Sequence, residues 1–201
     1  MQSGSIYSAA PFAEDNSILQ MISLEDYEST HFGETNESIK GRRNYHHALA
    51  NDSRLVAVSL TEPEIKIYEL DGSLMETVSL EDEPLLSETL NYMTQFYGDS
   101  GNSNSAVIMF QDATLIGDTL IVNVLNHKQE SNSKTTTYNN YIVYKLDEDS
   151  LQKTAAFRTN IGGRGVTSSF CVNENLLYST GGANQLDIYV FDIGEFITLD
   201  N

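Results

Sequence analysis

Three stretches of the chain repeat one pattern of apolar and polar positions, at residues 65–71, 141–147 and 188–193. When Tyr68, Tyr144 and Phe191 are aligned, an apolar or aromatic residue stands three positions before, one position before and two positions after the aligned residue in every copy. This near-alternation predicts a β-strand with a buried face in each stretch. Because the aromatic residues recur in phase with the repeat, we expect them to pack in the core between repeats.

A second predicted strand precedes each stretch, and a polar turn precedes that strand. The second strands are Arg54–Ser59, residues 118–124 and residues 175–180, and aligning their leucines matches Leu55 with Leu120 and Leu176. Polar turns between runs of β-branched and aromatic residues indicate hairpins. A further strand follows the first two copies, at residues 75–78 and 152–155, the first of them after Asp71-Gly72, a pair typical of a type I′ turn. Four antiparallel strands per repeat is the organisation of a β-propeller blade.

The spacing between repeats is irregular. Leu55 and Leu120 lie 65 residues apart and Leu120 and Leu176 lie 56 apart, against roughly 40 to 50 residues for regular propeller repeats. The polar stretches within residues 81–105 and 127–137 account for the excess, and we expect them to form loops. Inside the first stretch, residues 84–97 place apolar side chains at roughly helical spacing after Pro84. A short helix and an irregular connection between blades both fit this segment.

The start of the chain matches the repeat only in part. Residues 13–24 predict one or two strands of an incomplete repeat, and residues 29–43 predict a loop. We therefore expect an N-terminal extension over residues 1–12 and one all-β domain over residues 13–201, a partial β-propeller of about three to four four-stranded antiparallel blades. A β-sandwich without propeller closure is the alternative fold.

Composition adds a strong negative charge to this picture. The chain has 29 Asp and Glu against 11 Lys and Arg, a formal net charge of -18. An anionic surface repels phosphate backbones and anionic lipid headgroups, so we expect neither nucleic acid nor a membrane surface as a partner. No apolar run approaches the ~18 residues of a bilayer-spanning helix, which argues against membrane insertion. Cys171 is the one cysteine, so no disulfide can form within the chain, and its apolar neighbours predict a small core residue.

The repeat resembles a known family. Residues 55–59 (LVAVS), 64–78 (EIKIYELDGSLMETV) and 173–193 (NENLLYSTGGANQLDIYVFDI) are similar to the TolB-like six-bladed β-propeller family of largely gut-dwelling bacteria, whose blades repeat an I-x-I-Y-D-L-D-G strand and turn followed by a short outer strand. The resemblance covers residues 45–193. It implies part of a six-bladed ring, because six blades need about 300 residues, so the missing blades come from a longer chain or from a partner. It also implies the cell envelope or periplasm, although the lipoprotein-type export signal usual in the family is absent.

Candidate ligand contacts are few, because basic residues are few. The candidates for contact with an anion are Arg42, Arg43, His46 and Arg164. Arg164 lies in a glycine-rich stretch whose backbone amides suit an anion, but the stretch favours a turn between blades, because a strand and not a helix N-terminus is predicted to follow it. The cluster at residues 42–47 has a second interpretation, which is to balance nearby acids such as Glu34 and Glu37. His46 and His47 are adjacent, so on a strand they point to opposite faces and cannot hold one metal ion together.

These observations predict a non-catalytic binding or scaffold domain that uses a propeller surface to hold a protein, peptide or glycan. The sequence predicts no metal site, no cofactor and no catalytic residue, and it has no G-x-S-x-G nucleophile motif. The alternative is a carbohydrate-active hydrolase or lyase whose site lies at the propeller axis, where loops from several blades meet. Turnover of glycan or ester substrates distinguishes the two hypotheses.

Overall fold

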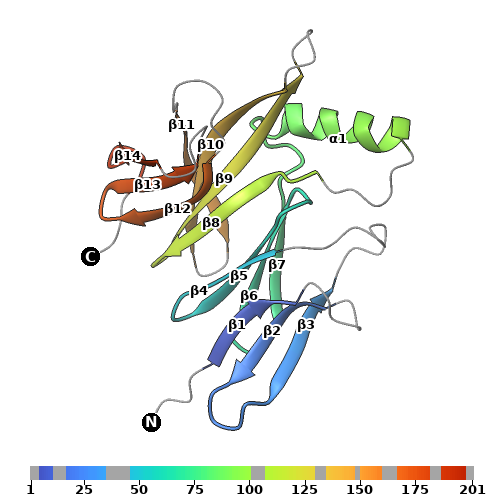
Figure 1. The fold of residues 1–201 in the computed structure, drawn as a ribbon. Helices are drawn as coiled ribbons and strands as arrows, with labels where there is room; N and C mark the ends of the chain where they lie inside the picture. The colour runs from blue at the N-terminus through green and yellow to red at the C-terminus, as the bar shows by residue number, and fades with distance from the viewer. Residues whose placement is uncertain are drawn as a thin grey trace.

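The computed structural model describes residues 5–10, 17–34, 46–100, 107–129, 135–147, 150–159, 167–181 and 187–197, and these residues form strands and one helix (Figure 1). The elements are β1 Ser5–Ala9, β2 Ser17–Ser23, β3 Ser29–Glu34, β4 His46–Ala50, β5 Arg54–Ser59, β6 Glu64–Glu69, β7 Leu74–Ser79, α1 Ser87–Ser100, β8 Phe110–Ile116, β9 Thr119–Gln129, β10 Thr135–Leu146, β11 Leu151–Thr159, β12 Thr167–Asn173, β13 Leu176–Gly181 and β14 Ile188–Asp192. The predicted all-β class is confirmed.

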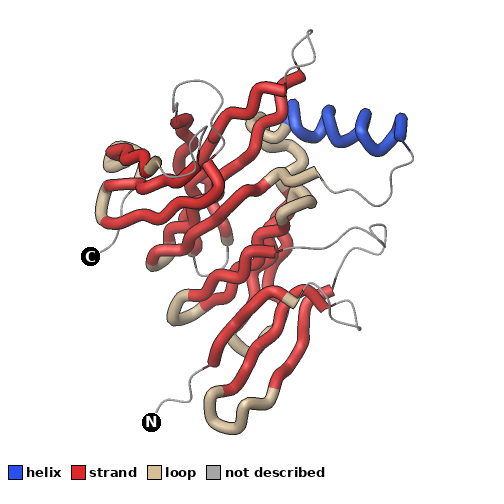
Figure 2. Tube along the Cα trace, viewed as in Figure 1, coloured by secondary structure: helices blue, strands red, loops and turns tan. Residues whose placement is uncertain are grey.

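The strands form four antiparallel sheets in the described part of the chain, and each strand pairs with its neighbour in sequence. The first sheet holds β1–β3, the second β4–β7, the third β8–β11 and the fourth β12–β14. In Figure 2 the strands make up most of the trace, and the helix lies at one end of it. The second and third sheets have the four strands predicted for one repeat, and the first and fourth have three.

The predicted strands of the repeat are present. Arg54–Ser59 is β5 with the predicted bounds, and the predicted strands at residues 75–78 and 152–155 lie within β7 and β11. The helical interpretation of residues 84–97 is confirmed, with α1 beginning at Ser87 and forming part of the connection between β7 and β8. The helix is anchored to the third sheet, because the Thr89 hydroxyl donates to the Leu125 carbonyl at 2.8 Å.

Three segments that were not predicted as strands contain strands within the described residues. The expected N-terminal extension contains β1, which pairs with β2 along its whole length. The expected loop at residues 29–43 begins with β3, and the expected loop at residues 127–137 contains the end of β9 and the start of β10, which pair from Thr135 and Gln129 onward. In β3 and in the paired ends of β9 and β10, backbone pairing with a neighbouring strand stabilises a segment with few apolar side chains.

The hairpin at Asp71-Gly72 has a different turn from the one predicted. Gly72 has a φ of +91°, but among the described residues the only non-glycine positive φ values are those of Tyr27 and Glu174. Asp71 therefore keeps a negative φ, and the turn is not type I′, which needs positive φ at both central positions. A bulge between Ile67 and Tyr68 accompanies this turn and adjusts the register of β7.

The core lies between facing sheets, and the aligned aromatic residues point into it. The cross-strand pairs are Leu55 with Tyr68, Leu120 with Tyr144 and Leu177 with Phe191, so the true counterpart of Leu55 in the fourth sheet is Leu177 and not Leu176. Tyr68 packs toward the first sheet, Tyr144 toward the second and Phe191 toward the third. The predicted role of these aromatic residues in packing between repeats is confirmed.

The sheets follow one another in chain order in space as well. The first strand of each sheet contacts the first strand of the next, β1 with β4, β4 with β8 and β8 with β12. The β4–β5, β8–β9 and β12–β13 turns consequently lie on the same side of the molecule (Figure 1). This row of first strands is where side chains from three sheets meet.

Candidate functional site

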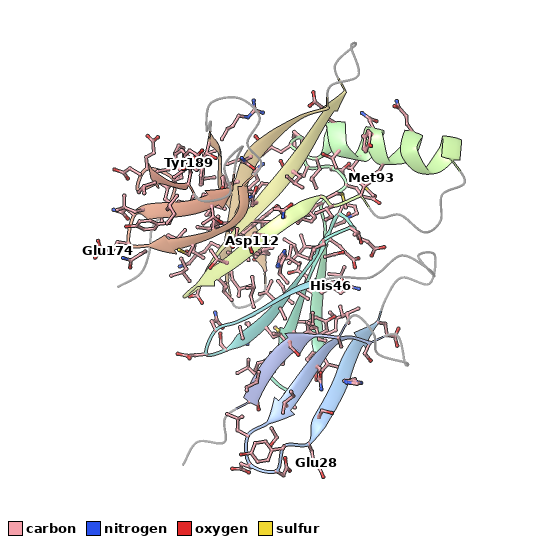
Figure 3. All side chains as sticks on the ribbon, in the orientation of Figure 1. Glu28, His46, Met93, Asp112, Glu174 and Tyr189 are labelled. Atoms are coloured by element: carbon pink, nitrogen blue, oxygen red, sulfur yellow. The ribbon has the colours of Figure 1, made fainter. Side chains whose placement is uncertain are left out.

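One aspartate joins three of the sheets where their first strands meet. Asp112 lies on β8 beside a bulge, because Phe110 pairs with Val124 and Asp112 pairs with the next residue back, Asn123. A bulge inserts one extra residue into a strand and changes the direction in which the nearby side chains point. Figure 3 shows Asp112 in the middle of the molecule, between the second and fourth sheets. We call Asp112 and the groups around it on β4 and β12, His47, Ser169 and Phe170, the Asp112 junction.

Both carboxylate oxygens of Asp112 have partners. Oδ2 accepts hydrogen bonds from the Ser169 hydroxyl at 2.9 Å and from the Phe170 backbone N–H at 2.8 Å, both on β12. Oδ1 accepts from the Ala113 N–H at 2.9 Å and lies 3.9 Å from Nδ1 of His47 on β4. A hydrogen bond to an ionised group contributes more than one between neutral groups, so one side chain holds the third sheet to the fourth and faces the second.

The histidine of the junction stays neutral over a wider pH range than a solvated one. Burial lowers the pKa of His47 below its ordinary value, because the charged imidazolium loses solvation. The Asp112 carboxylate and the backbone of Phe110 and Gln111 act in the opposite direction but do not outweigh burial. His47 and Asp112 therefore form a contact between a neutral ring and a carboxylate at neutral pH.

This pKa shift predicts a pH-dependent stability. The unfolded chain takes up the His47 proton at the ordinary histidine pKa, near 6.5, whereas the folded chain takes it up only at lower pH. We therefore expect the free energy of unfolding to fall as the pH drops below about 6.5 and to be fully retained above that value. Urea unfolding at several pH values between about 7.5 and about 5.5 measures this pH dependence of the free energy of unfolding.

The variant His47→Gln isolates the contribution of His47 to the pH dependence of stability, because glutamine does not titrate. Its stability should fall less with decreasing pH than that of the wild type, and the difference between the two curves removes the effect of the other titrating groups. Equal slopes for wild type and His47→Gln would contradict the assignment.

The order of groups in the junction does not match a nucleophilic triad. In a Ser–His–Asp triad the histidine lies between the serine and the acid, where it removes the serine proton. Here the carboxylate lies between Ser169 and His47 and accepts the serine hydrogen bond itself. The junction can position three strands, and it does not supply Ser169 with a histidine base.

A second polar link joins the second and third sheets nearby. The Asn51 side-chain amide, in the β4–β5 turn, donates to the Gly117 carbonyl at 3.0 Å and to the Asp118 carboxylate at 3.1 Å in the β8–β9 turn. Its own oxygen accepts from the N–H groups of Ser53 and Arg54 at 2.9 and 2.8 Å, which closes the turn locally. Two of the three predicted polar turns are thus fixed to each other and form one continuous exposed edge.

The predicted anion contacts are not gathered into a site by the described residues. His46 lies on β4 and is only 6% exposed. Arg42, Arg43 and Arg164 lie outside the described residues. The anion-contact hypothesis for these four residues stays a prediction. Cys171 differs from its prediction, because its side chain is exposed on β12 and is not in the core.

The described residues contain neither a metal-binding cluster nor a helix that could cross a membrane. No three His, Cys, Asp or Glu side chains within them are placed to hold a metal ion. The single helix found in this part of the chain is neither long enough nor apolar enough to cross a membrane.

Sequence reasoning missed Asp112, although the sequence holds a weak local signal. Gln111 and Asp112 place two polar residues in a row inside an otherwise apolar segment, which breaks the alternation expected of a strand. Such a break is typical of a bulge, and bulges are frequent beside functional sites. The partners on β4 and β12 carry no corresponding signal, because they lie far away in sequence.

Comparison of the sequence with protein-family models and with curated proteins gave no match. The relationship to TolB-like propellers therefore stays a prediction.

Proposed function

We propose that this chain is a set of β-propeller blades of the TolB-like type and acts as a non-catalytic binding or scaffold domain for a protein, peptide or glycan. Three features support the propeller arrangement. The sheets are consecutive antiparallel meanders, they pack face to face, and their first strands contact one another in chain order. A propeller has this organisation, with the first strand of each blade nearest the axis.

The main support for a binding role is that the polar groups at the centre hydrogen-bond to one another and hold sheets together. An enzyme keeps its acids and bases available to substrate, with matched protonation states. In the Asp112 junction the carboxylate instead accepts hydrogen bonds from Ser169, Phe170 and Ala113. These contacts hold sheets together, which favours a rigid support for surface turns over a reaction centre.

The exposed edge formed by the β4–β5 and β8–β9 turns is the proposed contact surface. It is rigid, because Asn51 links the two turns, and it carries Asp52 and Asp118. With a net charge of -18, the chain favours ligands that bring positive or neutral groups to this edge. Loops held by a rigid scaffold are the usual place for recognition residues.

Peptide and glycan arrays probed with the labelled chain test this proposal, together with turnover assays on glycoside and ester substrates. We expect saturable binding in one ligand class and no turnover. Asp52→Lys, which reverses a charge on the proposed edge, should weaken that binding at least about tenfold, a change of 1.4 kcal/mol. Glu25→Lys on the exposed β2–β3 turn is the charge-matched control and should bind like the wild type.

Two outcomes would overturn the proposal. Turnover of a glycoside or ester would favour the alternative, a hydrolase or lyase with its site at the propeller axis. The absence of binding to either array, with the protein shown to be folded, would remove the binding role itself.

A further inference from the structure

The fourth sheet exposes an apolar face. On β14, Ile188 is 66% exposed and Val190 is 53% exposed, whereas Phe191 points the other way and packs toward the third sheet. In the register of the sheet, Val190 lies beside Tyr178, and Tyr178 lies beside the exposed Cys171. We call the side chains of Cys171, Tyr178, Ile188 and Val190 the end face of the fourth sheet. Exposed apolar groups gathered on one sheet face are typical of an interaction surface.

The same positions of the repeat are covered in the two preceding sheets. Ile188 and Val190 stand three and one positions before the aligned aromatic residue, as Ile65 and Ile67 do in the second sheet. Ile65 is 0% exposed and Ile67 is 3% exposed, because both pack against the third sheet. The end face is therefore built like a face that a further sheet covers.

The third sheet repeats the observation independently. Tyr141 and Val143 hold the same two positions, with exposures of 0% and 1%, and they pack against Phe170 and Leu177 of the fourth sheet. The second and third sheets thus both show what covers this face. In both cases the cover is the opposite face of another sheet of the same repeat.

The first sheet offers such an opposite face. Ile6 on β1 is 50% exposed, and it lies beside Ile22 on β2 in the register of the sheet. Its neighbour Tyr7 packs toward the second sheet, so Ile6 points away from the molecule. The first sheet's outer side is the only sheet face in the described residues, besides the end face, that no other sheet covers.

We propose that the end face of the fourth sheet binds the outer face of the first sheet of a second copy of this chain. The inference goes beyond the proposed binding role and depends only on how the sheets pack. The contact is head to tail, because every junction within the chain pairs one face of a sheet with the opposite face of the next. Head-to-tail contacts form a ring when the rotation closes and a filament when it does not.

Light scattering after size exclusion, over a range from low micromolar to high micromolar protein, tests the proposal. We expect a mass that rises from one chain toward two or more. Ile188→Asp should raise the dissociation constant at least about tenfold, because it places a charge in an apolar junction. Ile6→Asp should weaken association by a similar factor. Leu74→Asp, at an exposed apolar position on β7 away from both faces, is the control and should associate like the wild type.

Mixing the two interface variants distinguishes the partner face. Ile6→Asp keeps its end face intact, and Ile188→Asp keeps its first sheet intact, so an equal mixture should form a one-to-one pair that neither variant forms alone. A contact between two end faces would instead let Ile6→Asp associate by itself, which would overturn the head-to-tail arrangement. Both substitutions replace half-exposed or more exposed side chains, and circular dichroism checks that each variant is folded.

The thiol of Cys171 supplies a second readout at the end face. Because it is the chain's one cysteine and is exposed, a maleimide reports on this face alone. Alkylation should slow at least about threefold at concentrations where the wild type associates, and it should stay fast for Ile188→Asp. A single-chain mass at every concentration, or equal weakening by Leu74→Asp, would overturn the proposal.

Discussion

Replacing Asp112 with alanine is expected to lower the free energy of unfolding by about 2–4 kcal/mol. The variant removes the acceptor for the partly buried Phe170 N–H on β12 and for the Ser169 hydroxyl. It also removes the carboxylate that faces His47. Ser169 is exposed, so a water molecule can take the place of the carboxylate as the partner of its hydroxyl. The partly buried N–H of Phe170 would be left without an acceptor and would keep most of its desolvation cost.

Smaller changes at the junction should cost less, in a definite order. Asp112→Asn keeps one oxygen, so we expect it to lose part of what the alanine variant loses. Ser169→Ala removes one bond at an exposed position and should cost about 0.5–1.5 kcal/mol. Glu81→Ala, an exposed acid in the turn after β7, is the control and should stay within about 0.5 kcal/mol of the wild type.

Urea unfolding followed by circular dichroism gives these values. If Asp112→Ala is as stable as Glu81→Ala, the carboxylate does not hold the sheets together. Binding of the folded Asp112→Ala variant to the same arrays tests separately whether Asp112 contacts a ligand. Loss of binding with unchanged stability would assign Asp112 to ligand contact and would count against the structural role proposed for the junction.

The repeat could be predicted from the sequence because its signal is local. Tyr68 and Tyr144 each stand in a short run whose alternation follows from burial of one strand face, and both side chains are buried as expected. The same periodicity does not align the repeats to the exact residue. It matched Leu55 with Leu176, whereas cross-strand pairing shows that Leu177 is the equivalent residue, because a strand can shift by one position between two leucines that look alike.

Strands without an apolar face could not be predicted in this way. β3 contains His31 and Gly33 and has only one large apolar residue, Phe32, and the paired ends of β9 and β10 are polar. Backbone hydrogen bonds to a neighbouring strand determine these segments, and the side chains carry no periodic signal. Prediction from hydrophobic pattern therefore places loops where the structure has strands.

The Asp112 junction could not be predicted because its groups meet only through the stacking of sheets. Asp112 lies 57 residues before Ser169 in the chain, and Asn51 lies 66 residues before the carbonyl that it binds. The pattern of apolar and polar residues over a short stretch carries no information about such contacts. The exposure of Cys171 has the same origin, because its apolar neighbours predict a buried strand face, whereas the face that Cys171 occupies is covered by no other sheet of the described residues.

Replacing Gly33 with alanine is expected to destabilise the chain by about 2–5 kcal/mol, through two effects that add. Gly33 has a φ of +77°, a conformation in which a Cβ atom costs about 1–2 kcal/mol. That Cβ would also lie 2.6 Å from Cγ1 of Ile18 and 2.8 Å from the Tyr68 hydroxyl. Neither neighbour can move easily, because Ile18 is a buried β-branched residue and the Tyr68 ring packs on Phe32 at a centroid distance of 5.6 Å.

Gly117→Ala separates the two effects. Gly117 has a φ of +54°, but a Cβ there would meet no atom within 4 Å, so this variant should lose only the conformational part, about 1–2 kcal/mol. The excess cost at Gly33 then measures how tightly its Cβ position is enclosed by Ile18 of the same sheet and by Tyr68 of the second sheet. Equal costs at the two glycines, in thermal or urea unfolding of both variants, would mean that the junction between the first two sheets yields to an added methyl group. In that case the face-to-face packing from which the end-face contact is inferred would be looser than the close approach of Gly33 to the Tyr68 hydroxyl implies.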